Sequence, residues 1–277
     1  MTFQNIKNIK NPDFLKIGIF IFNWLTFKQT QKKSNDENKF KFEDHSNIVN
    51  FEGFSKLNSL FLLHLLDNSL IFPDPSTAPD HGLAAVGGDL SIERLLLAYN
   101  SGFFPWYNDG EPICWWSPDP RMVFDLKATN PIRITKSMRQ SKRNRGYEIR
   151  ENTCFKEVMQ HCGKVKRNHQ DGTWINEEML EAYARLHESG HAKSIEVFKD
   201  NELVGGLYGI DLKDKGVFCG ESMFSLATDA SKIAFMHLVD KLQGLNYQLI
   251  DAQVYNDHLD SLGAVEMNRE MFLSYLR

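Results

Sequence analysis

The spacing of hydrophobic and polar residues predicts three amphipathic helices. The first follows a Gly-Gly-Asp turn: apolar side chains recur with helical spacing from Ile92 to Asn100, Ser91 is a good N-cap, and Gly102 favours the position after a helix end. The other two are expected at 177–189, where Asn176 is the cap, and at 230–243.

Between and after these helices the pattern predicts strands. Ser194–Phe198 and Glu202–Ile210 flank a turn at Asp200-Asn201, Gly216–Ser222 forms a third strand, and Tyr247–Val254 has the continuous apolar character of a buried strand. A run of consecutive strands, then a helix, then a strand indicates an α+β layered fold.

Residues 1–68 have a different character and are expected to form a largely disordered extension. Gln29–Glu43 is nearly devoid of apolar residues, which is typical of disorder, whereas 57–66 is apolar enough to predict a short helix. The apolar stretch Ile17–Phe27 is shorter than the roughly 20 residues that a bilayer crossing needs. The composition changes at Phe72, where a proline-punctuated loop begins.

The net charge of −4 excludes a generally basic, nucleic-acid-binding surface, so any RNA site must be a local basic patch. Such a patch is present at 134–143, which reads as a basic helix with Lys136, Arg139 and Arg143 on one face. A solvated helix face is the alternative. The four cysteines form no C-x-x-C pair, which indicates reduced thiols in a cytosolic protein and no zinc site of paired cysteines.

Three polar residues have positions that suit chemistry. Asp251 and Gln253 lie two apart in the apolar strand, so they are expected on the same face, and a buried carboxylate there needs hydrogen-bond partners. Glu221 lies beside a glycine that lets a ligand approach closely. The alternatives are an aspartate that ties down a loop and a surface glutamate at a strand end.

Tryptophan side chains are the remaining candidates for a binding site. Trp106 follows a proline and Trp174 follows Gly172-Thr173, so both are suited to the rim of a site where a nucleobase stacks. Trp115 and Trp116 are instead expected to pack in a core, which is the commoner position of tryptophan.

The wording and order of several blocks are more specific than any single residue. GLAAVGGDLSIERLLLAYNSGFFPWYNDGEPICWWSPDPR, DGTWI, LHESGHAKSIEV, LVGGLYGI, FCGESMFS, DASKIA and LIDAQVYNDHLDSLGA follow one another from Phe72 to the C-terminus. Together they resemble the leucyl/phenylalanyl-tRNA–protein transferase family.

The resemblance implies a small N-terminal domain at 69–119 and a larger domain at 120–277 that is similar to the GNAT acyltransferase fold. It also implies a cytoplasmic bacterial enzyme of the N-degron pathway. That enzyme moves leucine or phenylalanine, and less readily methionine, from aminoacyl-tRNA to an N-terminal arginine or lysine of a protein. We expect no cofactor, no metal, and neither DNA nor a membrane among its partners.

The family's motifs imply roles for particular residues. D-A-Q matches D-x-Q and implies that Asp251 and Gln253 are catalytic, while GESMFS implies that Glu221 lies in the active-site wall. The remaining implied positions are Trp106 and Trp174 for the 3′-terminal adenosine, Leu207 and Phe218 for the aminoacyl side-chain pocket, and Lys136, Arg139, Lys142 and Arg143 for the acceptor stem.

The chemistry and two rival functions stay open at this point. The proton of the attacking amine is accepted either by the Gln253 carbonyl, oriented by Asp251, or by Asp251 through a water. An acyl-CoA N-acetyltransferase would need a Q/R-x-x-G-x-G/A loop, and the nearest match, Gln160–Val165, lacks the final small residue. An RNA-binding protein without enzymatic activity would leave the pairing of Asp251 with Gln253 unexplained.

Overall fold

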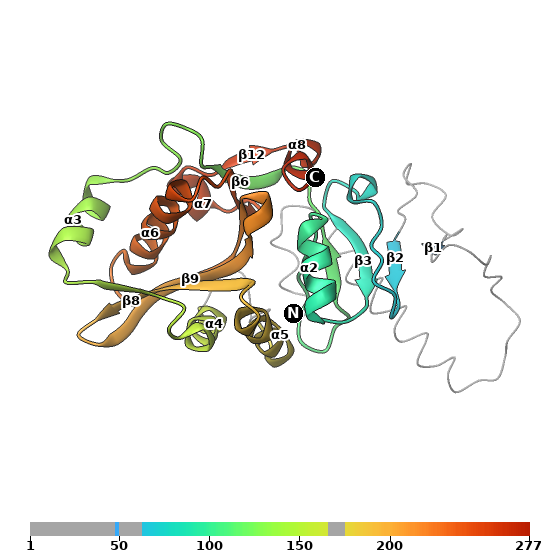
Figure 1. Ribbon diagram of the computed structural model, residues 1–277, viewed down its shortest axis with the longest axis horizontal. Coiled ribbons are helices and arrows are strands. Elements are labelled where there is room, and N and C mark those ends of the chain that lie inside the picture. Colours follow the sequence, from blue (N-terminus) through green and yellow to red (C-terminus); the bar gives the residue numbers. More distant parts are fainter. Residues whose placement is uncertain (1–47, 50–62, 166–174) are drawn as a thin grey trace, which may run out of the picture. The chain divides into compact units, whose positions relative to one another are not determined.

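The computed structural model describes residues 48–49, 63–165 and 175–277, and contains two sheets (Figure 1). The smaller sheet has the strand order β1-β2-β3-β5-β4, in which β2 and β3 are parallel. Its strands are β1 (Ile48–Val49), β2 (Leu63–Leu66), β3 (Leu83–Gly87), β4 (Phe104–Pro105) and β5 (Cys114–Trp116), with the 3-10 turn η2 (Pro75–Thr77) and helix α2 (Ile92–Asn100) between them.

The larger sheet has the order β12-β6-β11-β10-β9-β8-β7, and within it β10 and β11 form a parallel pair between antiparallel neighbours. Its strands are β6 (Arg121–Asp125), β7 (Glu148–Glu151), β8 (Ala192–Lys199), β9 (Glu202–Leu212), β10 (Val217–Ser225), β11 (Leu249–Gln253) and β12 (Val265–Met267). The accompanying helices are α3 (Lys136–Asn144), α4 (Phe155–Lys164), α5 (Glu177–Glu188), η3 (Lys213–Lys215), α6 (Ala230–Gly244), α7 (Asp257–Leu262) and α8 (Arg269–Ser274).

Helices cover both faces of the larger sheet, α6 on one and α4 with α5 on the other (Figure 1). Two adjacent glycines of β9 define these faces, because consecutive strand residues point to opposite sides. A Cβ atom on Gly205 would meet Ala230 of α6, whereas one on Gly206 would meet Val158 of α4. None of the helices in the described part of the chain has the length and apolar character that a membrane crossing requires.

Most predicted elements are confirmed. Ser91 caps α2 by accepting a hydrogen bond from the Arg94 N–H at 3.3 Å, and Asn176 caps α5 in the same way through the Met179 N–H at 2.8 Å. The basic helix begins at Lys136 rather than at 134, because Thr135 takes the N-cap position. The α+β class is confirmed by two sheets with flanking helices.

One expectation is wrong. The helix expected at 57–66 is a strand over Leu63–Leu66, which pairs in parallel with β3, so pairing with a neighbour overrides the local apolar pattern. Residues 57–62, the Ile17–Phe27 stretch and the polar Gln29–Glu43 segment lie outside the described residues.

The parallel pair β10–β11 determines where the polar residues of the core meet. Its main-chain register runs from Val217 and Leu249 to Cys219 and Asp251. Beyond that level both strands carry an irregularity, between Gly220 and Ser222 in β10 and between Asp251 and Gln253 in β11. Bulges redirect side chains locally, and here they lie side by side in neighbouring strands.

Candidate active site

Asp251 is a fully buried carboxylate with a buried cationic partner. The guanidinium of Arg121, the first residue of β6, donates from Nε to Oδ1 at 2.8 Å and from Nη2 to Oδ2 at 2.7 Å. Both side chains are at most 1% exposed. A bidentate pair of this kind satisfies the carboxylate in the geometry that an arginine fork fits best.

Gln253 stands at the end of β11 in a conformation that is uncommon for a side chain of its size. Its φ of +67° lies in the left-handed region, and its N–H donates to Oδ1 of Asp251 at 2.9 Å. Its side-chain Nε2 donates to Oε1 of Glu221 at 2.8 Å. With Nε2 turned to Glu221, the carbonyl oxygen is the end of the Gln253 amide left to receive another donor.

Glu221 is buried, and tyrosine hydroxyl groups lie next to its carboxyl group. Tyr183 of α5 donates to its Oε2 at 3.4 Å, and the Tyr183 hydroxyl in turn shares a hydrogen bond with the hydroxyl of Tyr99 from α2. Burial raises the pKa of the Glu221 carboxyl to about 8, and the nearby charge of Asp251 adds to the rise. Burial also raises the pKa of both tyrosines, so their hydroxyls stay protonated.

These groups form a cluster that favours an added positive charge. Asp251 and Arg121 neutralise each other, while Glu221 has no ion-pair partner among the residues that the structure describes. When Glu221 is ionised the cluster therefore carries one uncompensated negative charge. A cation that enters the site lowers the cost of that ionisation, because an opposite charge nearby stabilises a buried carboxylate.

The structure brings the three predicted catalytic residues together, with one difference from the expected geometry. Regular alternation would place Asp251 and Gln253 side by side on one strand face, but the bulge between them changes this. Asp251 binds the main chain of Gln253, and Glu221 binds its side-chain amide. Glu221, rather than Asp251, thus orients the amide.

Leu207 and Phe218 lie in the hydrophobic core beneath α6 and are 3% and 2% exposed. Phe218 pairs with Ile250, one position before the Cys219–Asp251 pair, so its side chain and that of Asp251 point to opposite faces of the sheet. Their assignment to an aminoacyl side-chain pocket remains a prediction.

The core packing expected of two tryptophans is confirmed, and the binding role of Trp106 remains a prediction. Trp115 and Trp116 are buried, and Trp116 donates from Nε1 to the carbonyl oxygen of Trp106 at 2.7 Å. Trp106 is half-buried, with its ring centroid 5.7 Å from that of Trp116. Trp174 lies outside the described residues.

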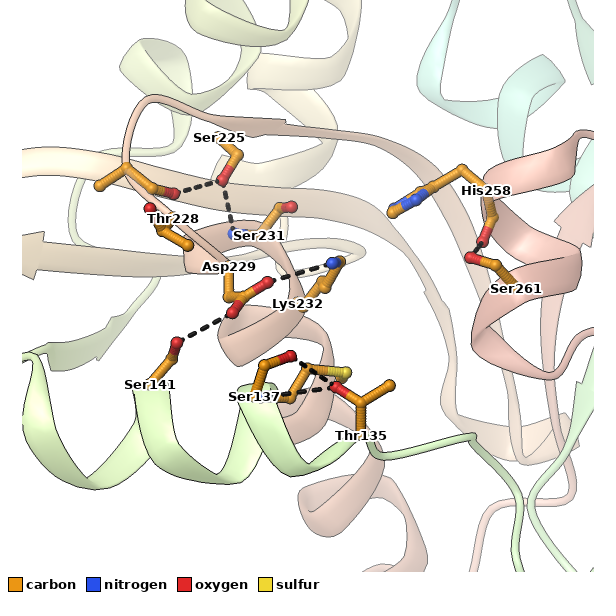
Figure 2. A network of polar contacts seen from close by, with 12 residues as sticks. Thr135, Ser137, Ser141, Ser225, Thr228, Asp229, Ser231, Lys232, His258 and Ser261 are labelled. Carbon is orange, nitrogen blue, oxygen red and sulfur yellow. Dashed lines mark hydrogen bonds and ion pairs between the residues drawn. The ribbon is translucent and has the colours of Figure 1, made fainter.

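The basic helix α3 has two buried residues, Met138 in the hydrophobic core and Ser141 in a polar contact at the start of α6. Figure 2 shows Asp229 between Ser141 of α3, which donates to it at 2.8 Å, and Lys232 of α6, which lies 3.0 Å away. Lys142 forms an exposed ion pair with Asp240 at 3.3 Å. The other three predicted RNA-contacting residues, Lys136, Arg139 and Arg143, are exposed and form no ion pair with an acid in 48–49, 63–165 or 175–277.

Arg121, Tyr99 and Tyr183 belong to the site but are not among the residues predicted for it from the sequence. A signal for Arg121 was present: an aspartate in an apolar strand requires a partner, and Arg121 is a charged residue at the start of another apolar strand. The two tyrosines lie on the buried faces of α2 and α5, where a hydroxyl also needs a hydrogen-bond partner.

Comparison with known proteins gives this cluster a context. The family model described as leucyl/phenylalanyl-tRNA protein transferase matches residues 126–277, and the model of that family's N-terminal domain matches 88–119. The leucyl/phenylalanyl-tRNA–protein transferase of Flavobacterium johnsoniae is 53% identical over 215 residues, which cover 78% of this chain and 99% of that protein. This chain belongs to the leucyl/phenylalanyl-tRNA protein transferase family.

Other relatives of the same name agree with this. That of Flavobacterium psychrophilum is 49% identical over 215 residues, or 78% of this chain and 100% of the relative. Among solved structures, L-PGS from Bacillus licheniformis has a TM-score of 0.34 and 11% identity over 63% of this chain and 54% of that chain, which is too small a likeness to support an argument. Membership of the transferase family also removes the acetyl-CoA alternative, whose nearest sequence match, Gln160–Val165, lies largely within helix α4 instead of in a loop.

The raised pKa of Glu221 predicts a pH effect on stability. The ordinary pKa of 4.5 applies to the unfolded chain and a pKa of about 8 to the folded protein, so the folded state holds the proton more tightly between these values. The stabilisation of the folded state by this bound proton is fully present below about pH 4.5 and is lost as pH rises through about 8. We expect the free energy of unfolding in urea to fall with pH in the wild type and to fall less in Glu221→Gln. Parallel curves for the two proteins would contradict the shift.

Proposed function

We propose that this protein transfers leucine or phenylalanine, and less readily methionine, from aminoacyl-tRNA to the N-terminal arginine or lysine of acceptor proteins, marking them for N-degron proteolysis. The observation that carries the proposal is the buried cluster in which Gln253, held by Asp251, meets Glu221. These residues lie within the part of the chain that the family model matches, residues 126–277, and family membership supplies the class of reaction.

The reaction needs alignment more than it needs a covalent nucleophile. The aminoacyl ester is already activated, and an α-amine with a pKa near 8 loses its proton readily. The amine nitrogen attacks the ester carbonyl carbon, the new C–N bond forms, the ester C–O bond breaks, and the amine proton finally resides on the ribose hydroxyl. Holding amine and ester together supplies several kcal/mol of the barrier reduction, on the order of what proximity gives in general.

In this mechanism Gln253 receives the amine and Glu221 attracts its charge. The Gln253 amide is turned so that Nε2 faces Glu221, which leaves its carbonyl oxygen to accept a hydrogen bond from the attacking amine. Glu221, when ionised, favours the cationic end of the acceptor protein. Burial gives Glu221 a pKa of about 8, which is close to that of an α-amine. A cationic acceptor beside Glu221 lowers this pKa and shifts the carboxyl toward its charged form.

Asp251 is the weaker choice of proton acceptor. Its two oxygens are occupied by Arg121, one of them also by the Gln253 N–H, and its side chain is fully buried. With these contacts in place, neither oxygen of Asp251 is left free to face an incoming amine or a bridging water. The proposal therefore assigns the amine's hydrogen bond to Gln253 and a supporting role to Asp251.

The remaining parts of the proposal concern the tRNA and the fold. Trp106 and Trp174 hold the 3′-terminal adenosine, Leu207 and Phe218 line the pocket for the aminoacyl side chain, and the exposed basic residues of α3 contact the acceptor stem. We further propose that 69–119 form a small N-terminal domain and 120–277 a GNAT-like catalytic domain, and that the enzyme works in the cytoplasm, where charged tRNA is found. The parallel β10–β11 pair with its adjacent bulges supports the GNAT-like assignment.

Transfer of radiolabelled leucine tests the proposal directly. Leucyl-tRNA is incubated with the protein and an acceptor that begins with arginine, and a matched acceptor that begins with glycine serves as the control. We expect label on the arginine acceptor alone, because the cluster favours a cation. If charged tRNA binds but neither acceptor is labelled, the proposed activity is wrong.

Replacing Gln253 by alanine tests the role of its carbonyl oxygen. We expect kcat to fall by about 10²-fold or more, in the range that loss of a proton-transfer partner gives, while the Kd for leucyl-tRNA stays within about two-fold. Gln248→Ala is the matched control, because Gln248 directly precedes β11 and its amide donates to the Asn246 carbonyl, outside the cluster. Unchanged turnover in Gln253→Ala would remove this residue from the mechanism.

The acceptor-stem assignment predicts a salt effect. We expect the double variant Arg139→Ala/Arg143→Ala to bind leucyl-tRNA more weakly and to show a smaller dependence of log K on log salt concentration, by about 0.7–0.9 per lost phosphate contact. Lys199→Ala/Lys213→Ala removes the same charge from exposed positions away from α3, at the end of β8 and the start of η3, and serves as the control. Equal weakening in both double variants would mean that net charge matters and that α3 itself does not.

A further inference from the structure

Arg121 makes more contacts than pairing with Asp251 alone requires. Its Nη1 donates to the carbonyl oxygen of Gly102 at 3.2 Å, just beyond the end of α2. Its guanidinium carbon lies 4.8 Å from the ring centroid of Phe104 in β4 and 4.5 Å from that of Phe272 in α8. A guanidinium held by two rings and three hydrogen-bond acceptors has little freedom to move, so its orientation is defined by three separate segments of the chain.

Arg121 fixes the orientation of the Asp251 carboxylate, and that carboxylate in turn holds the main chain of Gln253. The carboxylate lies in the plane that the Arg121 fork selects, and Oδ1 in that position accepts the N–H of Gln253. Gln253 needs such a contact because its φ of +67° is unfavourable for a residue with a side chain. The amide end of Gln253 then reaches Glu221 at 2.8 Å.

We propose that Arg121 is a positioning residue for aminoacyl transfer, which fixes Asp251 and through it the left-handed backbone of Gln253, so that the Gln253 carbonyl oxygen faces the amine. The inference rests on the proposed function, because it assumes that Gln253 receives the amine. Arg121 does not touch substrate in this scheme. Its effect appears in kcat rather than in the binding of either substrate.

Arg121→Lys separates geometry from charge. Lysine keeps the positive charge beside Asp251 but lacks the planar fork, so the carboxylate can rotate. A displacement of about 1 Å in a catalytic group can cost about 10²-fold in rate. We expect kcat to fall by roughly 10- to 100-fold, while KM for leucyl-tRNA and for the acceptor stays within about two-fold.

Arg269→Lys is the matched control. Arg269 is also a buried arginine, and it ties α8 to the chain through the carbonyl oxygens of Ser117, Ala78 and Pro79, at 2.6, 2.6 and 3.2 Å. It makes no hydrogen bond to Asp251, so its replacement tests the structural cost of losing a buried fork. We expect it to lower the melting temperature to an extent similar to Arg121→Lys and to leave kcat within about two-fold of the wild type.

The outcomes are distinguishable from failure of the proposed function. Wild-type protein that transfers no leucine would refute the function itself. Active wild type, inactive Gln253→Ala and fully active Arg121→Lys would overturn the positioning role alone, as would equal kcat losses in Arg121→Lys and Arg269→Lys. If Arg121→Lys does not fold, Phe272→Leu removes one ring from the guanidinium and keeps Arg121: a several-fold loss of kcat at constant KM supports the role, and an unchanged kcat overturns it.

Discussion

The buried ion pair between Arg121 and Asp251 is the interaction on which the site depends. Removing two such charges from water costs several kcal/mol for each, and only good geometry with additional hydrogen bonds offsets that cost. The bidentate contact, the Gly102 carbonyl and the flanking rings of Phe104 and Phe272 provide this compensation. Losing one member of a buried pair typically costs about 3–5 kcal/mol, so the same interaction that orders the active site also contributes to the fold.

The pair also determines what the neighbouring acid does. Because Arg121 pairs with Asp251, Glu221 has no cationic partner within the described part of the chain, and its neighbours are tyrosine hydroxyls and an amide. Two carboxyl groups in one cluster consequently have different surroundings: Asp251 is held by the Arg121 fork, and Glu221, without such a partner, has a pKa that burial raises to about 8. Separation of this kind between neighbouring acids is how a protein assigns one of them to respond to a substrate.

Local signals in the sequence were sufficient for most elements, and they singled out the three central polar residues without deciding between a catalytic and a structural role. Caps such as Ser91 and Asn176 act within one helical turn, so they can be predicted from neighbours alone. Leu63–Leu66 was misjudged because its strand conformation depends on β3, which is distant in sequence. The Arg121–Asp251 pair also depends on a distant partner, because it joins residues 130 positions apart. The bulge between Asp251 and Gln253, which lets the Gln253 amide contact Glu221 instead of Asp251, has no local signal either.

The orientation of the Gln253 amide has a consequence at the level of the gene. A single base change turns a glutamine codon into a glutamate codon, and the two side chains have nearly the same shape. Here the two side chains are not interchangeable, because Nε2 of Gln253 donates to Glu221 at 2.8 Å and a glutamate at position 253 would have no donor there unless one of the two carboxyl groups held a proton. Like charges this close force one group to keep a proton. Among all one-base neighbours of this codon, the closest steric match is thus a change that selection should remove.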